Sequence, residues 1–175
     1  IDALVFDMSA AGAAAFNSTV TGTSFNGIPF FSADTSSIYT HDVSGTDDTA
    51  NYNTAYGIEA LDAITTGDDN TALGYQSLSA NTTGQRNVAI GKKALFANTT
   101  ANYNIAIGFE ALAANTTAAD NIAIGKSTME ANTTGTRNLA IGFEAYVGSD
   151  TENDNIAIGY QAMTTNTAGG TENTA

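Results

Sequence analysis

The chain has 175 residues and a formal net charge of −13, with 18 acidic side chains against five basic ones. This excess of negative charge repels phosphate backbones, so we expect no nucleic-acid partner. Cysteine is absent and histidine occurs once, which excludes disulfides and thiolate metal sites and leaves little for acid–base or metal chemistry, so we expect no enzymatic activity and no cofactor.

The first region, residues 1–47, does not share the pattern of the rest. Its sequence predicts a strand, a turn at residues 9–12, a second strand and a connector around "NGIPFF", which together indicate an N-terminal β-hairpin adaptor. A lone hairpin is marginally stable, so we expect it to pack against partner chains. The apolar run at residues 10–16 is too short to span a bilayer, and we expect no membrane insertion.

The second region, residues 48–175, is an internal repeat. An Asn opens the same phrase every 17 residues, at Asn53, Asn70, Asn87, Asn104, Asn121, Asn138 and Asn155, and again at Asn173 after one extra residue. A short fixed period marks a solenoid, in which each unit is too small to bury its own apolar face and stacking supplies the core. The sequence therefore predicts an all-β stack of 17-residue coils, a parallel β-roll or solenoid.

Each repeat begins with a phrase close to N-[IVLT]-A-[ILY]-G, which is typical of a short strand closed by glycine. In one copy Ile105 and Ile107 share a face and Ala106 lies on the other, so both faces are apolar and we expect the strand to be covered on two sides. The Ala does not vary within the chain, which indicates close packing. That column is Ala55, Ala72, Ala89, Ala106, Ala123, Ala140 and Ala157.

The rest of each unit supplies an interior residue and a turn. A large apolar side chain recurs in phase and is predicted to fill the coil, at Leu61, Leu78, Leu95, Leu112, Met129, Tyr146 and Met163. Periodicity does not distinguish a strand from a helical turn here, and we favour a second strand. The unit closes on "ANTTG" or a relative, in which Asn and Thr side chains bond to nearby backbone.

Charge offers a check on stacking, because residues 17 apart become direct neighbours in such a coil. The position before each Asn places Arg86 beside Asp69, and Arg137 beside Asp120 and Asp154. The position after each Gly alternates Lys92 and Lys126 with the aromatic residues Tyr75, Phe109, Phe143 and Tyr160, a spacing that permits cation–π contacts. Both columns support in-register stacking.

The N-x-A-I-G phrase with its spacer resembles the head repeats of trimeric autotransporter adhesins, and the longer form with "GYQ" and "NTTG" resembles repeats in bacteriophage tail fibres and other phage structural proteins. The "LVFDMSAAGAAAFN" stretch is similar to segments that precede such repeats in phage fibres. The 17-residue spacing is longer than the usual adhesin head repeat.

The resemblance implies an intertwined homotrimer in which the Ala column lies near neighbouring chains. It also implies a structural and attachment role, in a virion tail fibre or on a cell surface. The expected partners are two further copies of the chain, other fibre or virion proteins bound through residues 1–47, and a host-surface glycan or protein.

Several residues have a second interpretation. Asn17, Asn81, Asn98, Asn115 and Asn132 match the N-glycosylation pattern, but the fixed phase of the last four favours turn chemistry. His41 stands without a partner group and is interpreted as a surface or interface residue. The acidic stretches at 46–48 and 67–70 do not fit a calcium loop and are interpreted as solvated turns, with bound Ca²⁺ left open.

Three further functions stay open. The column of Tyr75, Phe109, Phe143 and Tyr160 is a candidate surface for stacking on sugar rings, or else an interface between chains. Glu59, Glu110 and Glu144 share a column, and a pair of carboxylates is what glycan hydrolysis uses. Uncharged residues and Lys93 interrupt this column. A Thr column resembles the hydroxyl arrays of monomeric ice-binding solenoids, but it falls in a turn; its members are Thr82, Thr99, Thr116 and Thr133.

Overall fold

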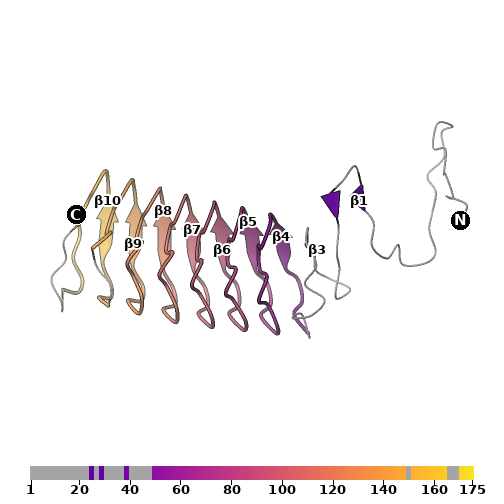
Figure 1. Cartoon of the computed structure of the whole chain (residues 1–175). Coiled ribbons are helices and arrows are strands. Elements are labelled where there is room, and N and C mark those ends of the chain that lie inside the picture. The colour runs from indigo at the N-terminus through magenta and orange to yellow at the C-terminus, as the bar shows by residue number, and fades with distance from the viewer. Residues whose placement is uncertain (1–23, 26–27, 30–37, 40–48, 149–150, 165–169) are drawn as a thin grey trace, which may run out of the picture.

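The computed structural model describes residues 24–25, 28–29, 38–39, 49–148, 151–164 and 170–175 (Figure 1). The described residues are strands and turns without helix, and successive coils stack side by side along one axis. The predicted turn at residues 9–12, His41, Asn17 and the acidic stretch at 46–48 lie outside the described residues. The described part of the first region contains a two-residue antiparallel pair, β1 (Ser24–Phe25) with β2 (Ile28–Pro29).

One parallel sheet runs through the stack, in the order β10 to β3. Its strands are β3 (Ile38–Tyr39), β4 (Thr54–Tyr56), β5 (Thr71–Leu73), β6 (Val88–Ile90), β7 (Ile105–Ile107), β8 (Ile122–Ile124), β9 (Leu139–Ile141) and β10 (Ile156–Ile158). From β4 to β10 each residue pairs with the residue 17 positions on, as Ala106 pairs with Ala123. The predicted solenoid with one coil per repeat is confirmed. The sheet also reaches β3, because Ile38 pairs with Thr54.

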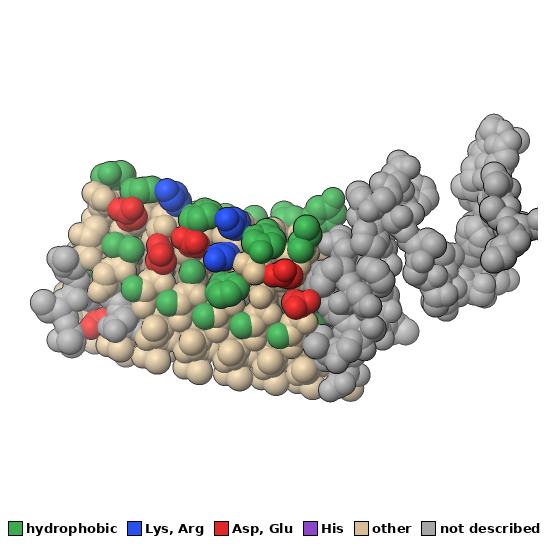
Figure 2. All heavy atoms as spheres, in the orientation of Figure 1, with side chains coloured by type: hydrophobic (Ala, Val, Ile, Leu, Met, Phe, Trp, Pro, Cys, Tyr) green, Lys and Arg blue, Asp and Glu red, His purple; other side chains and the backbone are tan. Residues whose placement is uncertain are grey.

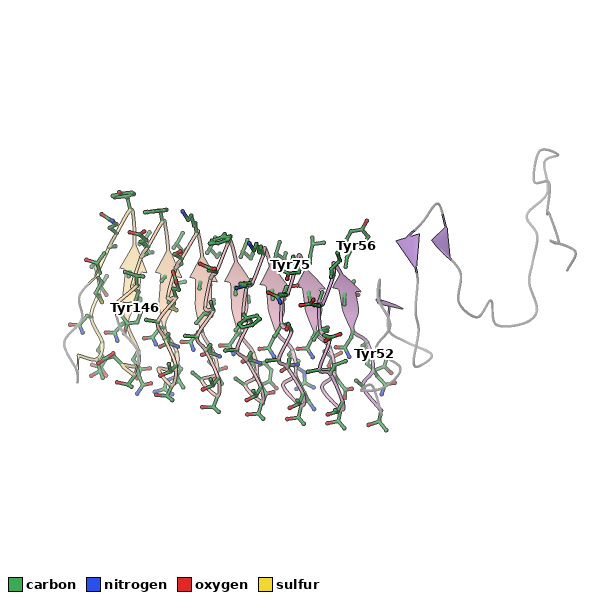
Figure 3. The ribbon with its side chains drawn as sticks, viewed as in Figure 1. Tyr52, Tyr56, Tyr75 and Tyr146 are labelled. Atoms are coloured by element: carbon green, nitrogen blue, oxygen red, sulfur yellow. The ribbon has the colours of Figure 1, made fainter. Side chains whose placement is uncertain are left out.

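The interior of the coil contains the large apolar column that the sequence predicts there, together with the Ala column of the strands. The Ala column from Ala55 to Ala157 is at most 1% exposed, and so are Leu61, Leu78, Leu95, Leu112, Met129 and Tyr146. Met163 is partly buried against this core. Tyr146 lies within the coil whereas Tyr56 points outward (Figure 3). Each coil therefore buries its strand Ala, one large side chain and a second small side chain beside it, such as Ala111 next to Leu112, and only the stack makes a continuous core.

The Asn that opens each repeat is a buried hydrogen-bonding link between coils. The Oδ1 of Asn87 accepts the backbone N–H of Asn104 at 2.9 Å, and the Nδ2 of Asn104 donates to the carbonyl of Ala118 at 2.9 Å. The same acceptor bond recurs at every coil from Asn53 to Asn155. One side chain thus ties its own coil shut and joins it to the next, which satisfies backbone groups that no strand reaches.

A second buried Asn column lies in the turn and settles the glycosylation question for these positions. Asn81, Asn98, Asn115 and Asn132 are 0% exposed. The Nδ2 of Asn98 donates to the Oδ1 of Asn81 at 2.9 Å and to the carbonyl of Ala101 at 3.2 Å. The amide nitrogen that a glycan would modify is enclosed and already bonded, which confirms the prediction of turn chemistry.

The predicted second strand is wrong. The segment after each glycine is a series of turns in which two non-glycine residues per coil have left-handed backbone, such as Glu110 with φ 54° and Leu112 with φ 51°. This alternation points the N–H groups of the two left-handed residues at opposite neighbours: Glu110 donates to the carbonyl of Lys92 in the preceding coil, and Leu112 donates to the carbonyl of Thr128 in the following coil. The segment keeps hydrogen bonds between coils without an extended backbone, so a strand pattern in the sequence is misleading here.

The glycine that ends each strand is required both by its backbone angle and by a close contact. Gly108 has φ 139°, and a Cβ built on it would lie 2.3 Å from the carbonyl oxygen of Gly125 in the next coil. Left-handed backbone favours glycine, and the close approach excludes any side chain. The tight corner therefore needs glycine at the same place in each neighbouring coil.

Removal of one whole coil should leave the fold intact. Deletion of residues 104–120 brings β6 next to β8 with every column still in phase, so we expect a cooperative thermal transition within a few degrees of the parent. Deletion of residues 104–112 breaks the phase of all later columns and should abolish that transition. Circular dichroism melting of the two variants checks this, and a folded half-coil deletion would contradict the in-register stack.

The Asn column should be intolerant of a nearly isosteric change. In Asn104→Asp, a carboxylate oxygen replaces the amide that donates to Ala118, and a charge is buried, so we expect a loss of about 3 kcal/mol in the free energy of unfolding. Asn102→Asp is the matched control, because the Asn102 Oδ1 only accepts from Gln85 N–H at 2.6 Å and Asp keeps an acceptor. Chemical denaturation compares the two, and equal effects would contradict the assigned role.

Candidate functional site

The outer side of the parallel sheet is an uncharged, largely apolar surface, which we call the sheet face. It is made of the first and third residues of each strand, Thr54, Tyr56, Thr71, Leu73, Val88, Ile90, Ile105, Ile107, Ile122, Ile124, Leu139, Ile141, Ile156 and Ile158. In the single chain these side chains are half-buried to exposed: Tyr56 is 50% exposed, Leu73 45% and Ile158 55%. A continuous apolar surface of this kind marks an interaction site more often than scattered apolar residues do.

The position before each Asn forms one border of the sheet face, the leading edge: Tyr52, Asp69, Arg86, Tyr103, Asp120, Arg137 and Asp154. Arg86 lies 3.5 Å from Asp69 and donates to the Tyr103 hydroxyl at 2.6 Å. Arg137 makes a two-pronged contact with Asp154, with Nε and Nη2 at 2.6 Å and 2.8 Å from the carboxylate oxygens. The predicted pairing of each Arg with an Asp in its own column is confirmed.

The position after each Gly forms the opposite border, the trailing edge: Ile58, Tyr75, Lys92, Phe109, Lys126, Phe143 and Tyr160. The Lys92 and Lys126 ammonium groups lie 5.6 Å and 5.9 Å from the Phe109 ring centroid. Lys126 is also 5.3 Å from the Phe143 ring, which stacks on Tyr160 at 5.4 Å with an interplanar angle of 10°. The predicted cation–aromatic column is confirmed, and it adds a link between coils outside the core.

This geometry bears on whether the aromatic column binds sugars. Phe109 is contacted by lysines of the preceding and following coils, and Phe143 by Lys126 and Tyr160. Stacking on a sugar needs an open ring face, and the neighbours already occupy the faces of these two rings. Tyr160 is 73% exposed and has the most open ring of the column. Sugar binding by the column stays a prediction, and Tyr160 is the residue best placed for it.

The Ala column lies inside the chain that carries it. Its side chains contribute to the hydrophobic core of one coil and are 0–1% exposed without any partner chain. The close packing inferred from these alanines is therefore packing within the chain. The larger residues on either side of each Ala are only partly buried and form the sheet face.

Most of the remaining candidate groups make contacts between coils. The Glu59 and Glu144 carboxylates accept hydrogen bonds from Gln76 and Gln161 at 2.6 Å and 2.7 Å. Asp68 accepts the Asn51 N–H at 2.8 Å. The hydroxyls of Thr82, Thr99 and Thr116 donate to carbonyl groups of the next coil at 3.1–3.4 Å, so they do not form a free hydroxyl array.

Within the described ranges, no group of three or more His, Cys, Asp or Glu side chains is arranged to hold a metal ion. The same part of the chain contains no helix with the length and apolar character needed to cross a membrane. Figure 2 shows charged and hydrophobic side chains gathered in one band along the stack, while its lower edge carries only uncharged atoms.

Comparison of the chain with known protein families, with curated proteins and with solved structures found no match. The function is therefore inferred from the geometry of the sheet face and its two edges. The sequence identified both edges from charge and aromatic spacing. It did not identify the sheet face as open, although alternate apolar residues around a buried Ala carried that signal.

The ion pair on the leading edge should be visible in an acid titration. The Arg137 guanidinium, by hydrogen bonding and by its charge, lowers the pKa of Asp154 below the ordinary value of 3.8. A carboxyl group whose pKa is lowered in the folded state stabilises the fold at pH values above its pKa in the unfolded state. This contribution is lost as the pH falls through the folded-state pKa. NMR titration should show the lowered pKa, and Arg137→Gln should return it toward 3.8. An unchanged pKa in that variant would contradict the pairing.

Proposed function

We propose that this chain is a non-enzymatic structural and attachment segment of a trimeric fibre, such as a phage tail fibre. The observation that carries the proposal is the sheet face, an apolar surface that continues over seven strands and contains no charged residue. Seven strands at the usual spacing make a surface about 34 Å long. A neighbour of equal length buries such a surface completely, and a second copy of the same chain has that length.

The rigid stack supports a spacer role. Each coil is joined to the next by sheet pairing, by buried Asn side chains and by edge contacts, so a load along the axis is shared by many bonds between coils. Parallel association of such rods through their sheet faces gives a thicker rod with polar corners outward. In this arrangement the Ile side of each strand is covered, as the two-sided apolar pattern of the sequence predicts.

The number of chains in the proposed assembly, three, and its attachment role come from the resemblance to trimeric adhesin heads and phage fibres. A phage fibre places the segment in a virion, and a cell-surface adhesin is the related alternative with the same architecture. Host-surface glycan or protein is the expected partner in either case, with Tyr160 as the most exposed aromatic side chain on the trailing edge. The remaining fibre or virion proteins are expected to bind through residues 1–47.

Native mass tests the proposal. One chain has a mass of 17.9 kDa, so light scattering on the purified protein should give about 54 kDa for three chains. Ile107→Lys places a charge at the middle of the sheet face and should release monomers, because an unpaired buried charge is costly. Thr117→Lys adds the same charge to an exposed turn residue off that face and should leave the trimer unchanged.

A single-chain mass for the unmodified protein would overturn the trimeric fibre. An equal response of the two lysine variants would show that the sheet face is not the surface between chains.

A further inference from the structure

We infer that the two edges of the sheet face fix the height of neighbouring chains, with Asp120 of one chain bound to Lys126 of the next. The inference rests on the proposed trimer and names how its chains meet. Its evidence is the order of charged and aromatic residues along the two edges.

Symmetry decides which residues meet. In a closed ring of parallel chains, every contact joins two different surfaces, so the leading edge of one chain faces the trailing edge of the next. Rotation about an axis parallel to the stack moves no chain along that axis. The two residues that flank the same strand in one chain therefore face each other across the contact between chains.

The flanking pairs are mostly complementary. From β4 to β10 they are Tyr52 with Ile58, Asp69 with Tyr75, Arg86 with Lys92, Tyr103 with Phe109, Asp120 with Lys126, Arg137 with Phe143, and Asp154 with Tyr160. They comprise an ion pair, a cation–π pair, two aromatic or apolar pairs, and two carboxylates beside tyrosines. Arg86 with Lys92 is the exception, and Arg86 is already paired within its own chain with Asp69 at 3.5 Å.

The ion pair at β8 is the most specific of these contacts. Asp69 and Asp154 each form an ion pair with an Arg of their own chain. Asp120 flanks β8 on the exposed edge, and the Arg next to it in the column, Arg137, pairs with Asp154 instead. Lys126 contacts only ring faces of its neighbours, which leaves its ammonium group able to bind a carboxylate as well. A stagger of one coil in either direction would place Asp120 opposite Phe109 or Phe143 and lose this pair.

The two residues do not reach each other within one chain. Strand β8 lies between them. The segment from Asn121 to Gly125, just inside the two residues, already covers roughly 13 Å when extended at about 3.3 Å per residue. A disulfide requires Cα atoms about 4.4–6.8 Å apart. Since the chain has no native cysteine, a disulfide between positions 120 and 126 reports a contact between chains and nothing else.

The test is disulfide cross-linking of the full chain. The D120C/K126C variant, oxidised at native concentration, should run as a covalent trimer on a non-reducing gel, and D120C or K126C alone should run as single chains. The R86C/D120C variant is the opposing probe, because an antiparallel dimer through the sheet face puts those positions together around Tyr103. Cross-linking of that pair, or a native trimer in which D120C/K126C forms no disulfide, would overturn the inference.

Charge exchange provides a second readout that needs no cysteine. Asp120→Lys should weaken the trimer, and addition of Lys126→Asp in the same chain should restore it, as measured by the protein concentration at half dissociation. Failure of the exchange to restore a trimer that Asp120→Lys weakens would count against the pair. A monomeric unmodified chain would instead overturn the proposed function, so the two failures are distinguishable.

Discussion

The structure depends on the bond between the buried Asn side chains of successive coils. A coil of 17 residues contains only three residues in a strand, and strand pairing alone leaves most of its backbone groups without partners. The Asn104 side chain supplies two of the missing partners. Its Nδ2 donates across its own coil to the carbonyl of Ala118, and its Oδ1 accepts the N–H of Asn121 in the next coil. The side chain fills both roles wherever successive coils stack in phase, and the 18-residue step from Asn155 to Asn173 keeps the same bond.

The fixed phase then determines everything outside the core. Residues at the same position of neighbouring coils become columns, and a column concentrates the chemistry of its members. Lys between aromatic rings and Arg beside Asp act as links between coils on the surface. The same logic leaves an apolar column on each side of the buried Ala, which creates a sheet face that one chain does not cover. In this way a requirement of folding produces the uncovered apolar surface on which the proposed assembly depends.

Much of this could be predicted from the sequence, since columns are visible once the period is known. The interior column of Leu and Met, the turn role of the NTT asparagines and the cation–aromatic edge all follow from phase. The second segment of each coil could not be predicted, because Glu110 and Leu112 have left-handed backbone that local preferences oppose and only the stack enforces. The place of the Ala column was also ambiguous, since a small residue signals close packing without saying whether the neighbour belongs to the same chain.

We propose that other copies of the chain bury the sheet face. Hydroxyl-radical footprinting of the native protein tests it most directly, by comparing Tyr56 and Leu73 on the face with Phe96, which lies away from it. In a single chain Tyr56 and Leu73 are 50% and 45% exposed and should oxidise readily. If other copies bury the sheet face, Tyr56 and Leu73 are strongly protected in the native protein and become reactive in the Ile107→Lys variant. Phe96 should react equally in the two proteins. Oxidation of Tyr56 and Leu73 at the same rate in the two proteins would contradict this proposal.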